Sequence, residues 1–61
     1  MSQLPLTELE VVYDALAEAI NQVGTEQESL FLTKLVLLLA NQVGNQAQVE
    51  QAIHTALLDL Q

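Results

Sequence analysis

The one pair of residues in this 61-residue chain whose spacing suggests a histidine-containing metal site lies near its C-terminal end. The only histidine, His54, follows Glu50 by four residues, so the two side chains would share one face of a helix. Ferritin-like di-iron sites use Glu-x-x-His pairs from two helices together with further carboxylates. Here the spacing is one residue longer and each chain supplies one histidine, so a metal site would need two symmetry-related copies. Glu50 and His54 are the candidate metal ligands, but we prefer a hydrogen-bonded surface histidine and expect no metal and no other cofactor.

Catalytic groups are equally scarce. Ser29 has no neighbouring base in the sequence, whereas a serine nucleophile needs one to activate it. Tyr13 could offer its hydroxyl to a ligand, but such a tyrosine more often packs its ring and keeps its oxygen near water. Cysteine and glycine-rich phosphate loops are absent from the sequence. We therefore predict that the protein is not an enzyme.

The charge of the chain excludes several kinds of partner. Eight carboxylates stand against one basic residue, Lys34, and the formal net charge is −7. Nucleic-acid binding needs Lys and Arg to displace counterions, so we expect no nucleic-acid partner. Glu10, Asp14 and Glu18 follow one another at four-residue intervals and would form an acidic face on a helix. A solvated surface is the simpler interpretation, and a face for a basic partner or a divalent cation is the alternative.

No membrane or export signal is recognisable. The N-terminus "MSQLPLTELE" lacks the basic start and apolar core of a signal peptide. The most apolar stretch, "LFLTKLVLLLA", is eleven residues long and contains Lys34. A spanning helix needs about 20 apolar residues, so we expect a buried helix and no membrane partner. A cytoplasmic location is the default expectation.

Two glycines divide the chain into three segments with helical periodicity. The sequence "NQVG" ends the first two, at residues 21–24 and 41–44, and glycine commonly follows the last turn of a helix. The residues before each "NQVG" share only apolar positions, so we interpret the repeat as two similar helix ends and not as a duplicated unit.

Capping sequences mark the starts. Residues 7–10 and 25–28 read Thr-Glu-x-Glu, which fits the capping box, and residues 45–48 carry an amide version of it. We predict a single all-α domain over residues 1–61, with residues 1–6 as an N-terminal extension. Its helices are expected at about 7–23, 25–43 and 45–60. The short connections favour a compact three-helix arrangement.

The middle helix has more apolar surface than two neighbours can cover. The first and third helices each show one apolar stripe, whereas the middle helix has a broad apolar arc with Leu30 and Leu37 outside it. These two leucines lie seven residues apart, and we predict that they belong to a seam between copies of the chain. The interface candidates are Leu30, Leu37, Lys34, Asn41 and Leu58, the last lying outside the stripe of its own helix. The expected assembly is a homo-oligomeric helical bundle, a homodimer or larger.

Three stretches together resemble a family of small uncharacterised bacterial proteins. "YDALAEA", "EQES" and "LTKLVLLLANQVGN" look like that family's aromatic-acid-Ala-Leu helix, its acidic second start and its LVLLLAN-x-x-G end, over about residues 12–45. Lys34 stands where members often have arginine, and Gln42 where many have histidine. Any metal or ligand role of that histidine would be missing here. The resemblance implies a short all-helical cytoplasmic protein without an established activity, sometimes a companion of catabolic oxidoreductases.

Two functions are consistent with these features. The first is a non-enzymatic, self-associating interaction module or accessory subunit, which could dock on a protein such as a catabolic oxidoreductase. The second is a binder of a small molecule, such as an aromatic acid, or of a metal. Its pocket would lie between helices or subunits, near Tyr13, Phe31 and His54.

Overall fold

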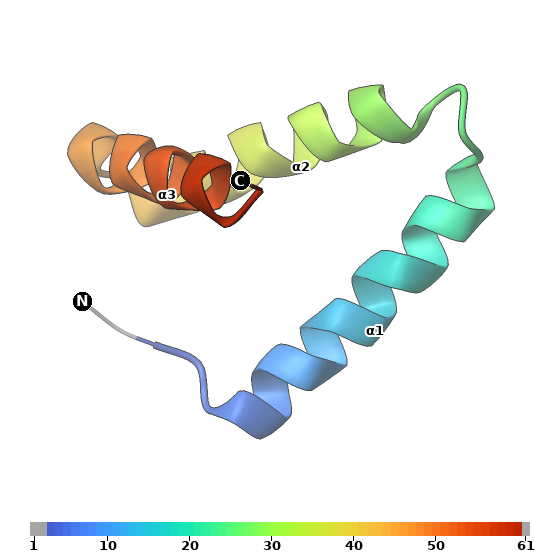
Figure 1. Ribbon diagram of the computed structural model, residues 1–61, viewed down its shortest axis with the longest axis horizontal. Helices are drawn as coiled ribbons and strands as arrows, with labels where there is room; N and C mark the ends of the chain where they lie inside the picture. The colour runs from blue at the N-terminus through green and yellow to red at the C-terminus, as the bar shows by residue number, and fades with distance from the viewer. Residues whose placement is uncertain (1–2, 61) are drawn as a thin grey trace. The chain divides into compact units, whose positions relative to one another are not determined.

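The computed structural model describes residues 3–60, and over these residues the chain is all-α, with three helices and no strand (Figure 1). The helices are α1 (Leu6–Val23), α2 (Glu28–Val43) and α3 (Gln46–Asp59). The predicted all-α class and the number of helices are confirmed. Packing into a homo-oligomeric bundle stays a prediction. None of the helices over the described residues combines the length and the hydropathy needed to cross a bilayer.

The start of α1 differs from the prediction. Pro5, and not Thr7, is the N-cap, and its carbonyl oxygen accepts from the amides of Glu8 at 3.0 Å and Leu9 at 2.9 Å. Proline has its φ fixed and lacks an amide hydrogen, so it precedes a helix at no loss of hydrogen bonding. No side chain caps this end. Leu6 is the first helical residue, one residue before the expected start at about 7. Of the predicted extension over residues 1–6, residues 1 and 2 lie outside the described part.

The start of α2 was also predicted wrongly. The helix begins at Glu28 and not at Thr25, because residues 25–27 first form a turn. The amide of Gln27 donates to the carbonyl oxygen of Gly24 at 3.3 Å, and the α-helical ladder begins when the amide of Phe31 donates to Gln27 at 2.9 Å. The turn uses the residues that the predicted capping box would have used.

The start of α3 and the ends of α1 and α2 follow the prediction. Asn45 has an extended backbone, and its Oδ1 accepts from the amide of Gln48 at 3.0 Å, which makes it the N-cap. Gly24 and Gly44 have φ of 80° and 69°. Their amides donate to the carbonyl oxygens of Ile20 and Ala40 at 3.1 and 3.0 Å, so both "NQVG" sequences close helices.

The chain divides into two compact units, the first ending at Phe31 and the second beginning at Leu32. The first holds α1 and the first turn of α2, and the second holds the rest of α2 together with α3.

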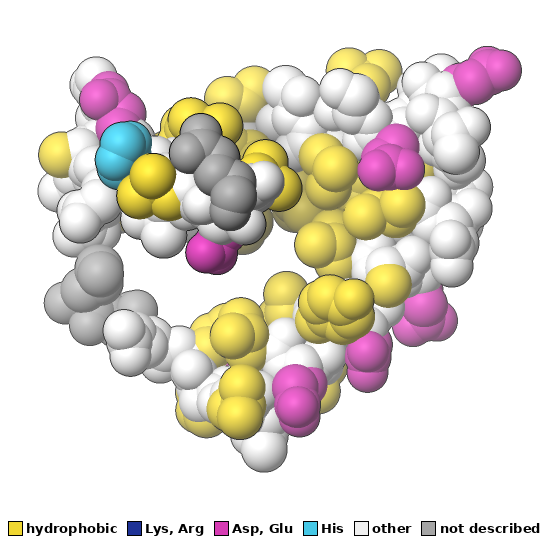
Figure 2. Space-filling model, viewed as in Figure 1, with side chains coloured by type: hydrophobic (Ala, Val, Ile, Leu, Met, Phe, Trp, Pro, Cys, Tyr) yellow, Lys and Arg dark blue, Asp and Glu magenta, His cyan; other side chains and the backbone are white. Residues whose placement is uncertain are grey.

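No residue in the described part of the chain is buried. The apolar stripes predicted as core are at most half-buried: in α1 these residues are Leu16, Ala19, Ile20 and Val23, and in α3 the half-buried residue is Val49. Figure 2 shows hydrophobic side chains open on the surface of the molecule. In the second unit, the absence of buried residues has a simple cause. Each of two helices can cover only one side of the other, so a pair of helices cannot enclose a core.

Candidate functional site

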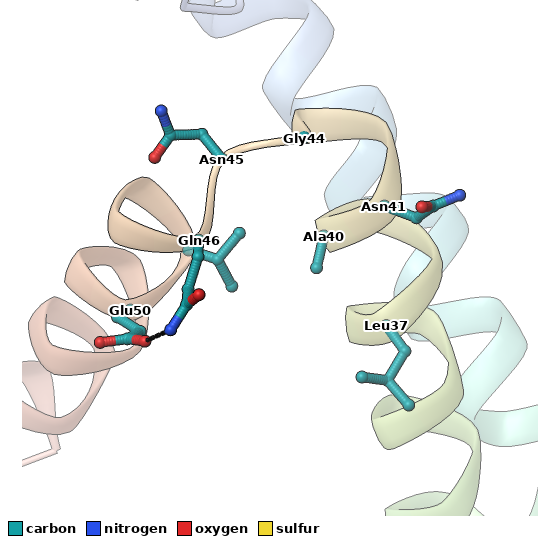
Figure 3. Close-up of a pocket in the computed structure, with 8 residues that line it drawn as sticks. Leu37, Ala40, Asn41, Gly44, Asn45, Gln46 and Glu50 are labelled. Atoms are coloured by element: carbon teal, nitrogen blue, oxygen red, sulfur yellow. Dashed lines mark hydrogen bonds between the residues drawn. The ribbon is translucent and has the colours of Figure 1, made fainter.

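A groove lies at the junction of α2 and α3 (Figure 3). Its volume is about 430 Å³. It belongs entirely to the second unit and combines the last turns of α2 with the first turns of α3. The residues that line it are Leu37, Ala40, Asn41, Gly44, Asn45, Gln46, Val49 and Glu50.

The groove follows from a connection of only two residues. Gly44 closes α2 with a positive φ, and Asn45 at once caps α3, so the two helices meet at a tight corner. Glycine is suited to this position because it adopts positive φ without strain against a Cβ. Ala40 and Gly44 have little or no side chain, which leaves the corner open, while Leu37 and Val49 supply apolar walls.

One wall of the groove is polar. Nε2 of Gln46 donates to Oε2 of Glu50 at 2.7 Å, a hydrogen bond between side chains four residues apart on α3. Glu50 is the charged residue among those that line the groove. Asn41 directs its amide away from α3 (Figure 3), so it borders the groove from the outer side of α2.

The structure does not place further metal-ligating side chains around the two predicted metal ligands, Glu50 and His54, within residues 3–60. Glu50 lines the groove and His54 does not, and Glu50 is hydrogen-bonded to Gln46. Over residues 3–60, no group of three or more His, Cys, Asp or Glu side chains is placed to hold a metal ion.

The structure brings two of the five interface candidates to the groove, namely Leu37 and Asn41. The other three, Leu30, Lys34 and Leu58, do not line it. Leu30 and Leu37 are 53% and 65% exposed, so both side chains are available for contact.

The side of α2 that carries these two leucines also carries small residues. Leu30, Thr33, Leu37 and Ala40 follow one another at intervals of three, four and three residues, which places all of them on one face of α2. We call this face the α2 seam. Ala40 belongs to both the seam and the groove. The sequence places Thr33 beside the two leucines, but Ala40 is less apolar than its neighbours and was not predicted to belong to this face.

The carboxylates are divided unequally between the units. Six of the eight lie in the unit that ends at Phe31, which has no Lys or Arg. The other unit carries Glu50 and Asp59 together with Lys34 and the only histidine. The predicted acidic face is present as an exposed stripe on α1, formed by Glu10, Asp14 and Glu18. The second unit is thus close to neutral and the first is strongly acidic.

Comparison with known proteins places the chain in a family. A family model described as "Protein of unknown function (DUF2783)" matches residues 3–57. The chain belongs to this family. The match includes all of α1 and α2 and most of α3, so it reaches well beyond the stretches that carry the resemblance in the sequence. Searches of curated proteins and of solved structures gave no match.

Proposed function

We propose that this protein is a non-enzymatic helical module that self-associates through α2 and acts as an accessory subunit. The observation that carries this proposal is the composition of α2. Successive residues of an α-helix are about 100° apart around its axis, so Lys34 and Asn41 lie close together and form a narrow polar strip. Apolar residues occupy most of the rest of the circumference of α2. None of its residues is buried. A helix that is apolar on nearly all sides needs cover on nearly all sides.

The energetics favour cover by another chain. Full burial of a leucine side chain contributes about 1.5–3 kcal/mol. Covering the exposed leucines of α2 would therefore stabilise the protein considerably. A domain of fewer than about 70 residues usually needs disulfides, a metal or association. The sequence has no cysteine, which removes the first of these reinforcements.

Charge favours a second copy as the occupant of the α2 seam. Thr33, Leu37 and Ala40 of the seam lie in the unit beginning at Leu32, where Glu50 and Asp59 stand against Lys34, so charge repulsion along this part of the seam is weak. Thr33, between the two leucines, and Ala40, one turn after Leu37, are small, which lets two helices approach closely along the seam. Lys34 has no carboxylate three or four residues away on α2, so a carboxylate of the second copy would be a natural partner.

A pair of matched double variants tests the proposal. Leu30→Gln with Leu37→Gln changes two exposed residues seven apart on α2, and Leu6→Gln with Tyr13→Gln does the same on α1. We expect the α2 pair to lower the molar mass measured by light scattering, and the α1 pair to leave it unchanged. An unchanged mass for the α2 variant, or an equal loss for both, would rule out the α2 seam.

The groove supports a second candidate function, the binding of a small ligand. A volume of about 430 Å³ exceeds the lower limit of about 300 Å³ for ligand pockets, and its lining mixes apolar walls with Gln46 and Glu50. The carboxylate of Glu50 would repel an aromatic acid and attract an amine. A thermal-shift screen with aromatic acids, aromatic amines and divalent metals separates these cases. Absence of stabilisation by every compound would count against this function.

A further inference from the structure

The groove between α2 and α3 is a cleft that a single chain leaves unfilled. Figure 3 shows the two helices diverging from the corner at Gly44. Ala40 and Val49 line the groove near this corner and are half-buried, whereas every other residue of α3 is exposed. One turn further from the corner, Leu37 on α2 and Ile53 on α3 are 65% and 50% exposed. The apolar sides of the two helices therefore separate beyond their first contact and leave room between them.

The charge of the groove is complementary to the only cation of the chain. Glu50 is the charged residue of the lining, and Gln46 donates to one of its two carboxylate oxygens, Oε2, at 2.7 Å. Lys34 is the only Lys or Arg in the sequence, and it is exposed. It does not line the groove of its own chain. A basic side chain that reaches Glu50 from a second copy must therefore be Lys34.

Side-chain sizes along the α2 seam favour an antiparallel pair of seams. The four seam residues lie on one continuous helix, so their spacing is fixed. In a parallel pair each residue meets its own counterpart, so leucine faces leucine and alanine faces alanine. In an antiparallel pair centred on the middle of the seam, Leu30 faces Ala40. Leu37 faces Thr33 in the next layer, so a large side chain meets a small one each time, as close packing requires.

We propose that two copies of the chain associate antiparallel along α2, so that Leu30 of each copy enters the groove of the other and Lys34 pairs with Glu50 there. Lys34 of the second copy would be level with residue 36 of the first, about 6 Å along the axis from Ala40, a distance that a lysine side chain can span. Two-fold symmetry makes each contact occur twice. The inference rests on the proposed self-association and adds its direction, its register and the ion pair. The groove would be occupied in the assembly, so a small ligand would enter only the separate chains.

Charge-reversal variants of the full chain, compared by sedimentation equilibrium, test the ion pair. Lys34→Glu and Glu50→Lys should each raise the dissociation constant by about 2- to 30-fold, the equivalent of two exposed ion pairs at about 0.2–1 kcal/mol each. The double variant should associate more tightly than either single variant. Net charge alone predicts the opposite for Glu50→Lys, because this change adds two positive charges to a chain of net charge −7 and lowers the repulsion between copies.

Asp59→Lys is the matched control. It makes the same change of charge on the other carboxylate of the second unit, which is also exposed and lies nine residues after Glu50. It should not raise the dissociation constant. Combined with Lys34→Glu, it should show only the sum of the two single effects, as expected for residues that do not touch. Far-ultraviolet circular dichroism at equal concentration checks that every variant keeps its helices.

An exchange of side-chain sizes tests the register. Ala40→Leu takes up room in the groove that Leu30 of the second copy would use, so it should raise the dissociation constant about tenfold or more. Adding Leu30→Ala to this variant should restore most of the lost affinity. In a parallel pair Ala40 would face Ala40, so Ala40→Leu would fill a gap there and strengthen association.

Any one of three results would overturn the proposal. These are equal effects of Glu50→Lys and Asp59→Lys, a double charge variant that associates no more tightly than the single variants, and unchanged or stronger association of Ala40→Leu. If one of them occurs while Leu30→Gln with Leu37→Gln still lowers the molar mass, self-association through α2 stands and only the antiparallel arrangement fails. An unmodified chain that is monomeric at every concentration would contradict both.

Discussion

Replacement of Leu37 by glutamine should weaken self-association by an amount that can be worked from the exposure of the side chain. Leu37 is 65% exposed in the single chain, and full burial of leucine contributes about 1.5–3 kcal/mol. About 1–2 kcal/mol per copy is therefore gained only on association, or about 2–4 kcal/mol for a symmetric dimer. At a factor of ten for every 1.4 kcal/mol, the dissociation constant should rise by about 30- to 700-fold. Glutamine has nearly the helix propensity of leucine, so α2 itself should persist.

Sedimentation equilibrium over a wide concentration range measures this dissociation constant directly. Leu6→Gln is the matched control, because Leu6 is 70% exposed but lies on α1. Far-ultraviolet circular dichroism at equal concentration checks that both variants keep their helices. A change of less than threefold for Leu37→Gln, or a change of the same size for Leu6→Gln, would refute the assignment of Leu37 to the interface.

Three further substitutions test the local structure. Asn45→Ala removes the side-chain oxygen that accepts from Gln48 and should cost about 0.5–2 kcal/mol in urea unfolding; no change would mean that the cap is not formed in solution. In Gly44→Ala the added Cβ would have no atom within 4 Å, so only the strain of a positive φ should lower the stability. We expect a loss of about 1–2 kcal/mol in the free energy of unfolding, seen as a lower melting temperature. Asp14→Asn removes both like-charge pairs of the α1 stripe and should raise stability by about 0.4–1 kcal/mol at low salt. That gain should vanish in high salt, and a gain independent of salt would show another cause.

The ends of the helices were predictable from the sequence because single residues decide them. Glycine is the residue that best tolerates the positive φ found at Gly24 and Gly44, and asparagine is a strong N-cap, as at Asn45. The starts of α1 and α2 were not predictable in this way, because groups close to Thr7 and Thr25 form the first hydrogen bonds in place of the threonine side chains. The carbonyl of Pro5 begins the first ladder two residues earlier, and a turn closed between Gly24 and Gln27 delays the second. Such choices differ by little free energy, and the capping sequence alone does not resolve them.

The candidate site was predictable only in part. The spacing of Leu30 and Leu37 pointed to the α2 seam, and the four-residue steps of Glu10, Asp14 and Glu18 pointed to the acidic stripe. The groove depends on the absence of side chains at Gly44 and Ala40, and a sequence pattern built on apolar residues does not register an absence. Exposure of Tyr13 depends on which part of α1 its neighbours cover, which is a property of packing and not of α1 alone.

The central claim is that α2 is covered by a second copy of the chain, and the most direct test is the molar mass of the unmodified protein. Light scattering over a hundredfold range of concentration, with the melting temperature followed in parallel, measures both association and its link to stability. We predict a dimer or larger assembly whose melting temperature rises with concentration. A monomer at every concentration, with a constant melting temperature, would contradict the claim.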